Sequence, residues 1–113
     1  AVLTGVTPEM DAYYEEIFGP VAVVYSVSDD DEAVELANAV EYGLSGSVWS
    51  SDVERATALA DRLDVGMALV NEHGTSLPGL PFGGVKASGY GRELGRWGLG
   101  EFANLRLRRV TKN

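Results

Sequence analysis

The sequence contains no cysteine, and only one of its 113 residues is a histidine, His73. Without cysteine these residues form neither a disulfide nor a thiolate metal site, and they supply no cysteine nucleophile. No group of residues has the spacing of metal ligands, so no metal site is expected. A small hydrolase using Ser76 and His73 stays open as an alternative, although one histidine beside one serine is weak evidence for a catalytic triad.

Long apolar runs and an excess of basic residues are also missing. No apolar run is long enough to span a bilayer, and residues 1–6 lack the basic and apolar regions of a signal peptide. We therefore expect a cytoplasmic protein with no membrane contact. The net charge of −8 argues against nucleic acid as a partner. The charge is uneven, because the acidic residues gather before position 65, and we interpret this as a solvated acidic face with a basic tail.

Three apolar segments rich in β-branched residues are typical of buried strands. They span residues 21–27, 47–50 and 67–71. Apolar residues at helical spacing predict a helix after each of the first two, with Ser28 and Ser51 as the expected N-caps. The order predicts an α/β fold with a three-layer-type parallel sheet and crossover helices. The first residues resemble a strand in progress, so we expect a segment of a longer protein.

The second half of the chain has a different character. Glycine and proline punctuate residues 73–91, which predicts an ordered loop, and a short helix is expected within residues 92–102. Residues 105–110 alternate apolar with basic side chains, as in a half-exposed strand. Such a strand has no evident partner in this sequence, so we expect it to pair with another subunit or with another part of the same protein.

Two segments have the composition of a ligand site. Residues 15–21 read Glu-Glu-Ile-Phe-Gly-Pro-Val. A carboxylate there can accept hydrogen bonds from ribose hydroxyls, and a phenyl ring can pack on a flat heterocycle. The alternative is that Ile17 and Phe18 belong to the core and that the glutamates are solvated. The glycine-rich residues 80–95 are neither a P-loop nor a dinucleotide fingerprint, because the required spacings are absent.

These segments resemble the aldehyde dehydrogenase superfamily. The resemblance rests on Glu-Glu-Ile-Phe-Gly-Pro-Val at 15–21 and on Pro-Phe-Gly-Gly-Val-Lys-x-Ser-Gly-x-Gly-Arg-Glu-Leu-Gly at 81–95. It implies that residues 1–104 are the C-terminal part of the catalytic domain and that residues 105–113 are an oligomerisation strand or tail. It also implies that the nucleophilic cysteine, the general base and the cofactor-binding domain precede Ala1.

The resemblance also implies roles for individual residues. Glu16 resembles the glutamate that binds the nicotinamide-side ribose of NAD or NADP, and Phe18 resembles the aromatic residue that positions the nicotinamide. Phe82 resembles the phenylalanine that lines the aldehyde pocket. Glu93 resembles a buried glutamate with a structural or proton-relay role.

The loop before Phe82 falls where family members vary their substrate contacts, so Thr75 and Ser76 are candidates for substrate binding. The loop looks most like bacterial enzymes of the succinate-semialdehyde dehydrogenase type. The alternative for both hydroxyls is that they cap the turn.

The activity implied for the full-length enzyme is oxidation of an aldehyde to a carboxylic acid, through a cysteine thioester and with NAD or NADP. The isolated chain is then expected to be inactive. Its expected partners are the aldehyde, the N-terminal remainder of the enzyme and a second subunit bound through the C-terminal strand. A second hypothesis, motivated by that strand, is a non-enzymatic α/β module for subunit assembly.

Overall fold

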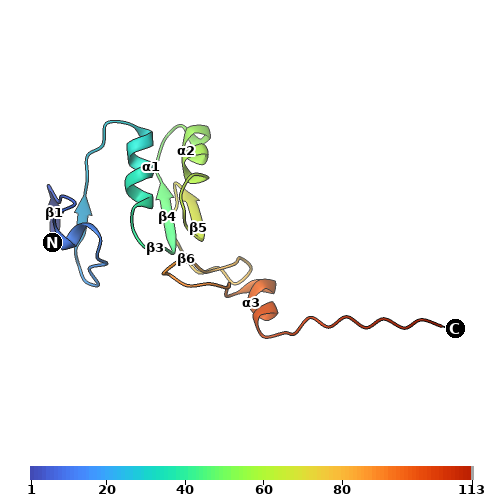
Figure 1. The fold of residues 1–113 in the computed structure, drawn as a ribbon. Helices are drawn as coiled ribbons and strands as arrows, with labels where there is room; N and C mark the ends of the chain where they lie inside the picture. Colours follow the sequence, from blue (N-terminus) through green and yellow to red (C-terminus); the bar gives the residue numbers. More distant parts are fainter. Residues whose placement is uncertain (113) are drawn as a thin grey trace.

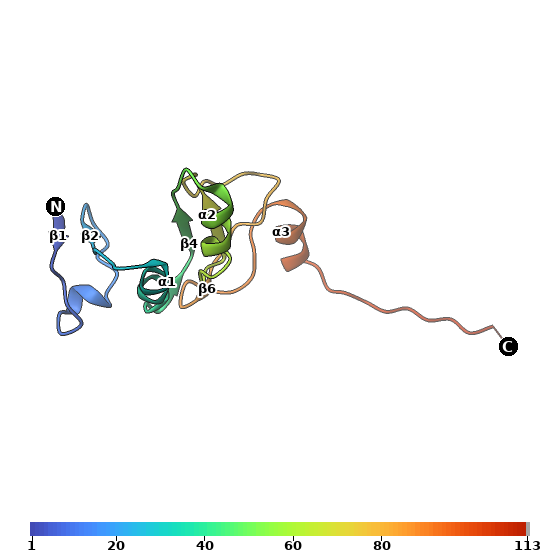
Figure 2. The ribbon, with the colours of Figure 1, turned by 90° about the horizontal axis from the view of Figure 1, so that it is seen from above.

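The computed structural model describes residues 1–112 and has an elongated α/β fold. Figure 1 shows an N-terminal strand pair on one side, a central unit of helices and strands, and a C-terminal segment that leads away from both. The radius of gyration is 18.8 Å, whereas a compact domain of this length has about 13 Å. The view from above in Figure 2 shows the same succession along one axis. The chain is therefore not a closed globule.

The N-terminal unit is a parallel pair of short strands. Strand β1 (Val2–Thr4) pairs with β2 (Ala22–Val24), and the 3₁₀ helix η1 (Asp11–Tyr13) lies in the connection between them. The ring of Tyr13 meets that of Tyr25 edge-to-face, with centroids 5.7 Å apart. This contact ties the connection to the end of β2.

Helix α1 (Asp30–Asn38) follows β2, but its N-cap differs from the expected one. The cap is Asp29, whose carboxylate accepts a hydrogen bond from the backbone N–H of Glu32 at 2.9 Å. Ser28 instead donates its backbone N–H and its hydroxyl to the Glu32 carboxylate, each at 2.7 Å. These two hydrogen bonds hold the pKa of Glu32 below its usual range. The prediction of Ser28 as cap was wrong because the adjacent aspartate competes for the same position.

The central unit consists of β4 (Ser45–Val48), α2 (Val53–Ala60) and β5 (Met67–Val70), with β4 and β5 parallel and in register from Ser45↔Met67 to Val48↔Val70. The N-cap of α2 is Asp52 rather than the expected Ser51, and its carboxylate accepts from the backbone N–H of Arg55 at 3.0 Å. Here too the expected cap lies one residue before an aspartate that takes the role.

Charged side chains join α1 to α2 and to the residues that directly follow α2. Arg55 pairs with Asp30, and Arg62 pairs with Asp31 at 2.6 Å. The hydrogen bond from Arg55 holds the pKa of Asp30 below its usual range. Because these groups are exposed to solvent, each ion pair contributes little to stability.

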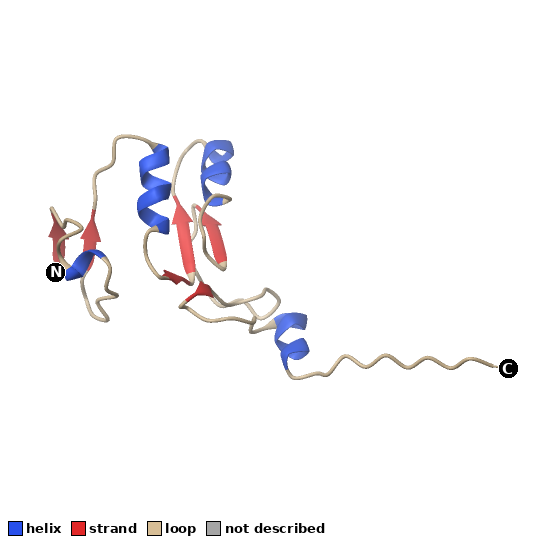
Figure 3. Ribbon diagram, viewed as in Figure 1, coloured by secondary structure: helices blue, strands red, loops and turns tan. Residues whose placement is uncertain are grey.

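The strands do not form the single parallel sheet that the sequence pattern predicts. Within residues 1–112 they form separate pairs, β1 with β2, β4 with β5, and the short β3 (Tyr42–Gly43) antiparallel to β6 (Val85–Lys86). Figure 3, in which the strands are red, shows that the β1–β2 pair lies apart from the strands of the central unit. The apolar pattern of a strand identifies the strand but not the strand it pairs with. The predicted positions of β2, β4 and β5 are therefore correct, whereas the prediction that all three belong to one sheet was wrong.

The core is small. Among the described residues only Val34, Ala56 and Ala60 are buried apolar side chains. Large apolar side chains are instead exposed along much of the chain, and the most exposed are Phe18, Tyr90, Phe102, Leu105 and Leu107. A protein that stands alone rarely leaves so much apolar surface uncovered. An exposed apolar surface of this extent is typical of a surface that other protein residues cover.

The C-terminal segment begins with α3 (Gly95–Glu101), within the range predicted for a short helix. Residues 105–110, predicted to be a strand that pairs outside this sequence, are extended and exposed and pair with no other strand among residues 1–112, so the prediction of a pairing strand stays a prediction. The remaining residue of that predicted tail, Asn113, lies outside the described residues. None of the described helices has the length and apolar character that crossing a membrane requires.

Candidate active site

The segment of the double glutamate lies in the loop between η1 and β2, on the side that faces the end of α1. Glu16 borders two adjoining cavities of about 530 and 490 Å³, and Tyr42 borders both with it. The Glu16 carboxylate accepts no hydrogen bond from residues 1–112. Phe18 is 95% exposed. The segment therefore presents a carboxylate and an aromatic ring that the described residues leave available.

The glycine-rich loop is held by backbone hydrogen bonds at the position of Phe82. Phe82 N–H donates to the Glu93 carbonyl at 2.9 Å, and Glu93 N–H donates to the Phe82 carbonyl at 2.7 Å. The guanidinium of Arg92 donates to the carbonyl oxygens of Gly84 and Gly91 at 2.8 and 2.6 Å. These contacts fix the backbone on both sides of the half-buried Phe82.

Close approach of backbone explains part of the glycine content of this loop. A Cβ added at residue 66, just before β5, would lie 2.0 Å from the Gly83 carbonyl oxygen and 2.7 Å from Gly84 Cα. At Gly84, a Cβ would lie 2.6 Å from the Cβ of Ser88. The loop therefore packs directly on the entrance to β5, which only glycine permits at these positions.

Lys86 attaches the loop to the helices. Its ammonium group donates to the carbonyl oxygens of Asn38 and Val40 at 3.0 and 3.3 Å and pairs with Asp64 at 3.2 Å. The carbonyl groups lie at the C-terminal end of α1, where a positive charge is favourable. Lys86 thus holds the loop against the end of α1 and against the segment that precedes β5.

Two residues connect the Glu16 side of the site to the Phe82 side. Leu44 and Ser88 border both the 490 Å³ cavity that Glu16 lines and a third cavity of about 670 Å³ that Phe82 lines. Ser88 is fixed in this position because its hydroxyl accepts a hydrogen bond from the Gly43 N–H at 3.0 Å. The two sequence segments therefore lie on opposite sides of the turn at Leu44.

Of the remaining predicted site residues, Glu93 borders the 670 Å³ cavity with Phe82, whereas Thr75 and Ser76 lie away from it. Glu93, expected to be buried, is exposed, because nothing among residues 1–112 covers its side of the loop. Thr75 and Ser76 are exposed and border none of the three cavities. The His73 ring lies against Trp49, with centroids 5.1 Å apart. No hydrogen bond links His73 to Ser76 within residues 1–112, so the hydrolase alternative lacks the geometry it needs.

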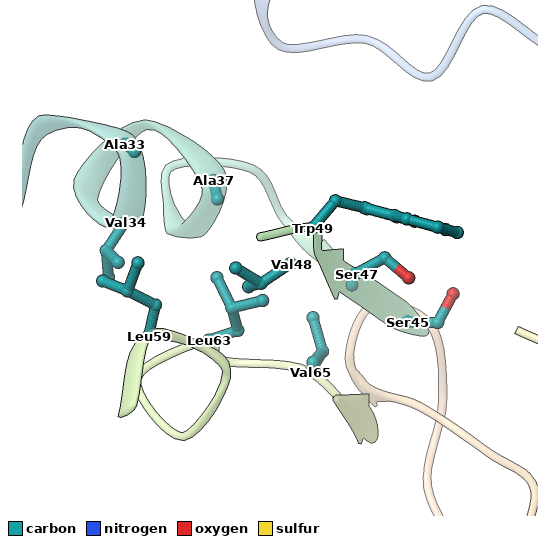
Figure 4. A pocket seen from close by; sticks show the side chains of 11 residues that line it. Ala33, Val34, Ala37, Ser45, Ser47, Val48, Trp49, Leu59, Leu63 and Val65 are labelled. Carbon is teal, nitrogen blue, oxygen red and sulfur yellow. The ribbon is translucent and has the colours of Figure 1, made fainter. Parts of the chain in front are cut away.

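A fourth cavity, of about 340 Å³, is mainly apolar; it shares Ala37, Ser45 and Val65 with the 490 Å³ cavity, but none of the predicted site residues lines it. Figure 4 shows that side chains of α1, α2 and β4 surround it, among them Val34, Leu59 and Val48. It offers few polar groups to orient a ligand, so it is a gap in the packing between the helices and β4 rather than a reaction site. No cluster of three or more potential metal ligands occurs among the described residues.

Sequence reasoning missed Leu44, Lys86 and Ser88 as parts of the site, and also Leu94, which borders the 670 Å³ cavity together with Phe82. A partial signal existed for Lys86 and Ser88, because polar residues inside a glycine-rich loop need partners for their side chains. Leu44 had no such signal, since its role depends on a loop more than 35 positions away in the sequence. Leu94 was hidden because its backbone, rather than its side chain, is unusual.

The α/β fold brings the segments 15–21 and 81–95 to neighbouring cavities. Comparison with known proteins gives the family to which this segment belongs. The model of the aldehyde dehydrogenase family matches residues 1–107. The chain belongs to the aldehyde dehydrogenase family. A succinate-semialdehyde dehydrogenase [NADP(+)] of Deinococcus radiodurans is 61% identical over 109 residues, which are 96% of this chain and 23% of that protein.

Solved structures agree with this assignment. The succinic semialdehyde dehydrogenase of Streptococcus pyogenes, in complex with NADP+, superposes with a TM-score of 0.93 at 47% identity, over 98% of this chain and 24% of that chain. A betaine aldehyde dehydrogenase of Staphylococcus aureus, in complex with NAD+, superposes with a TM-score of 0.85 at 40% identity, over 89% of this chain and 20% of that chain. The chain thus spans about a quarter of the length of these relatives.

Proposed function

We propose that this chain is the part of an NAD(P)-dependent aldehyde dehydrogenase that holds the nicotinamide side of the cofactor and one wall of the aldehyde pocket. The observation that carries the proposal is the succession of cavities from Glu16 to Phe82, joined at Leu44 and Ser88. In this proposal residues 1–104 belong to the catalytic domain.

The residues present fit a nicotinamide cofactor. The Glu16 carboxylate has both oxygens available to accept hydrogen bonds from vicinal hydroxyls, and the uncovered Phe18 ring offers a flat apolar face. NAD or NADP, when bound, supplies a hydride acceptor. Glu16 and Phe18 then orient the ring that receives the hydride, and Phe82 packs against the aldehyde.

The nucleophile must come from outside this chain, because the sequence has no cysteine. A thiolate from the remainder of the protein would add to the aldehyde carbon, the adduct would give its hydride to the oxidised cofactor and become a thioester, and water would hydrolyse the thioester to the acid and the free thiolate. Correct alignment of these groups accounts for much of the rate, so residues that only position the partners matter to it. Succinate semialdehyde is the proposed substrate, because the relatives from Deinococcus radiodurans and Streptococcus pyogenes are succinate-semialdehyde dehydrogenases.

The test of this proposal uses Glu16→Gln in the full-length enzyme, with succinate semialdehyde and NADP+. Loss of the charge weakens the hydrogen bonds to the ribose, and we expect the hydride-transfer rate to fall about tenfold. Stopped-flow absorbance of NADPH formation measures this rate, and a deuterated aldehyde shows whether hydride transfer is limiting. Glu35→Gln, which makes the same change on the exposed face of α1, should retain the wild-type rate. Equal rates for both variants would refute the role of Glu16.

We further propose that residues 105–113 join subunits. The supporting observation is that Leu105 and Leu107 are 104% and 90% exposed on an extended segment with basic neighbours. Alternating apolar side chains on an unpaired extended segment suit addition, as a strand, to a sheet of another subunit. Deleting these residues from the full-length enzyme should lower its mass in light scattering to that of a smaller assembly. An unchanged mass at micromolar concentration would reject this assignment.

A further inference from the structure

Leu94 has an unusual backbone conformation, in which φ is 66° and ψ is 164°. A residue with a side chain rarely adopts this combination, which is essentially restricted to glycine. Such a conformation persists only where surrounding contacts fix it, and it is found mostly at functional sites. Leu94 directly precedes α3 and directly follows the residue that pairs with Phe82.

The contacts on either side of Leu94 explain what holds this conformation. Before it, Glu93 exchanges two backbone hydrogen bonds with Phe82, at 2.9 and 2.7 Å. After it, the N–H of Gly95 donates to the Pro78 carbonyl at 3.0 Å. The chain must therefore change direction at Leu94 to reach both partners. A Leu94 in ordinary backbone geometry would have to give up one of them.

Both partners belong to one short segment, residues 78–82, which we call the pocket wall. The first of its residues is bound to Gly95 and the last to Glu93, so the segment is held at both ends by residues that flank Leu94. The Leu94 carbonyl in turn accepts from the Gly98 N–H at 2.9 Å, which attaches this arrangement to α3. Leu94 and Phe82 also border the same 670 Å³ cavity.

We infer that Leu94 is a positioning residue whose backbone conformation sets the place of the pocket wall, and thereby the length of aldehyde that the enzyme prefers. The inference rests on the proposed function, in which Phe82 lines the aldehyde pocket. Leu94 acts through the backbone of Glu93 and Gly95, so its effect falls on the aldehyde. The cofactor side, where Glu16 lies, borders a different cavity that Leu94 does not line.

The experiment compares backbone preferences at position 94 in the full-length enzyme. Leu94→Val is close in size, but a β-branched residue disfavours positive φ more strongly than leucine does. Leu94→Gly accepts positive φ freely. The readout is the ratio of kcat/KM for hexanal to that for propanal, together with the KM for NADP+. Leu69→Val in β5 removes the same methylene at a position with ordinary backbone geometry and serves as the control.

We expect Leu94→Val to change the hexanal-to-propanal ratio about tenfold, which is the discrimination that a methylene-sized change in an apolar pocket produces. The KM for NADP+ should stay at its wild-type value. The ratio of the separate variant Leu94→Gly should be much closer to the wild-type ratio than that of Leu94→Val. Leu69→Val should have the wild-type ratio. If Leu94→Val yields too little folded enzyme, Gly95→Ala replaces it, since the added Cβ would lie 3.2 Å from the Gly79 carbonyl oxygen and disturb the same wall.

A wild-type ratio in Leu94→Val, or in Gly95→Ala where that variant is used, overturns the inference. So does a ratio in Leu94→Gly equal to that in Leu94→Val, because the side chain rather than the backbone would then be responsible. Phe82→Ala distinguishes a failure of the role inferred for Leu94 from a failure of the pocket role proposed for Phe82. If Phe82→Ala shifts the ratio and the position 94 variants do not, the inference fails while the proposed pocket stands. If Phe82→Ala leaves the ratio unchanged, the proposed pocket role of Phe82 itself fails.

Discussion

Mixed with succinate semialdehyde and either NAD+ or NADP+, the 113-residue chain alone should form no NADH or NADPH above background. The proposed chemistry needs a thiolate nucleophile, and the sequence contains no cysteine. Removal of the nucleophile from an enzyme that works through a covalent intermediate lowers kcat on the order of a millionfold, which places turnover below detection. Absorbance at the wavelength of the reduced cofactor measures the outcome.

The control for this experiment is the full-length enzyme at the same molar concentration, which should give steady turnover. Addition of an equimolar, separately produced N-terminal remainder to the chain is a second arm, and activity that appears only there supports the division of roles. Clear turnover by the chain alone, free of any contaminating dehydrogenase, would contradict the requirement for a cysteine from outside it.

Gly66→Ala should be the most damaging single substitution among the glycines of the site. Its Cβ would lie 2.0 Å from the Gly83 carbonyl oxygen, and because the obstacle is backbone, no side-chain rotation relieves the overlap. We expect the free energy of unfolding of the full-length enzyme to fall by about 3 kcal/mol, at the upper end of overpacking effects. Urea denaturation followed by fluorescence measures the change. Activity toward aldehydes should fall as well, because Gly83 and Gly84, which the added Cβ would displace, directly follow Phe82.

Gly100→Ala is the matched control. It lies within α3, an added Cβ there has no heavy atom within 4 Å, and alanine favours a helix more than glycine does. The same measurement should show unchanged or slightly raised stability, by about 0.5 kcal/mol. Equal stabilities of the two variants would mean that the loop does not pack on residue 66 as described.

The sequence predicted the elements whose signals are local. The apolar run before α1 and those that became β4 and β5 were recognised because burial and β-branching are visible within a few residues. Helices α1 and α2 were recognised from their period. Their caps were each placed one residue early, since serine and aspartate both serve as N-caps and only the contacts of the folded chain decide between neighbours.

Features that depend on distant residues were not predicted. Strands β3 and β6 have two residues each and pair across more than 40 positions, so neither has a periodicity to detect. The same limit explains the wrong single sheet, because the pattern of a strand does not state its neighbour. The exposure of Glu93 and the meeting of two cavities at Leu44 and Ser88 likewise arise from packing between loops.

The candidate site was predicted in its two halves but not as a whole. Glu16 and Phe82 were identified from the motifs that contain them, and these positions remain the centre of the proposal. The left-handed backbone of Leu94 was invisible, since nothing in a Glu-Leu-Gly sequence indicates which residue takes the positive φ. Glycine would have been the natural choice, and the structure places Leu94 there in addition to Gly95.

The pairing of β4 with β5 alone has a practical consequence for the chain in solution. Within residues 1–112, β4 has a neighbouring strand on one side, so its other edge presents backbone amides and carbonyls to any strand that approaches. In the intact protein such an edge can be covered by other residues, whereas in the separated chain it is a template for unwanted association. Purification of the chain therefore calls for dilute solutions, and its apparent melting temperature should depend on concentration.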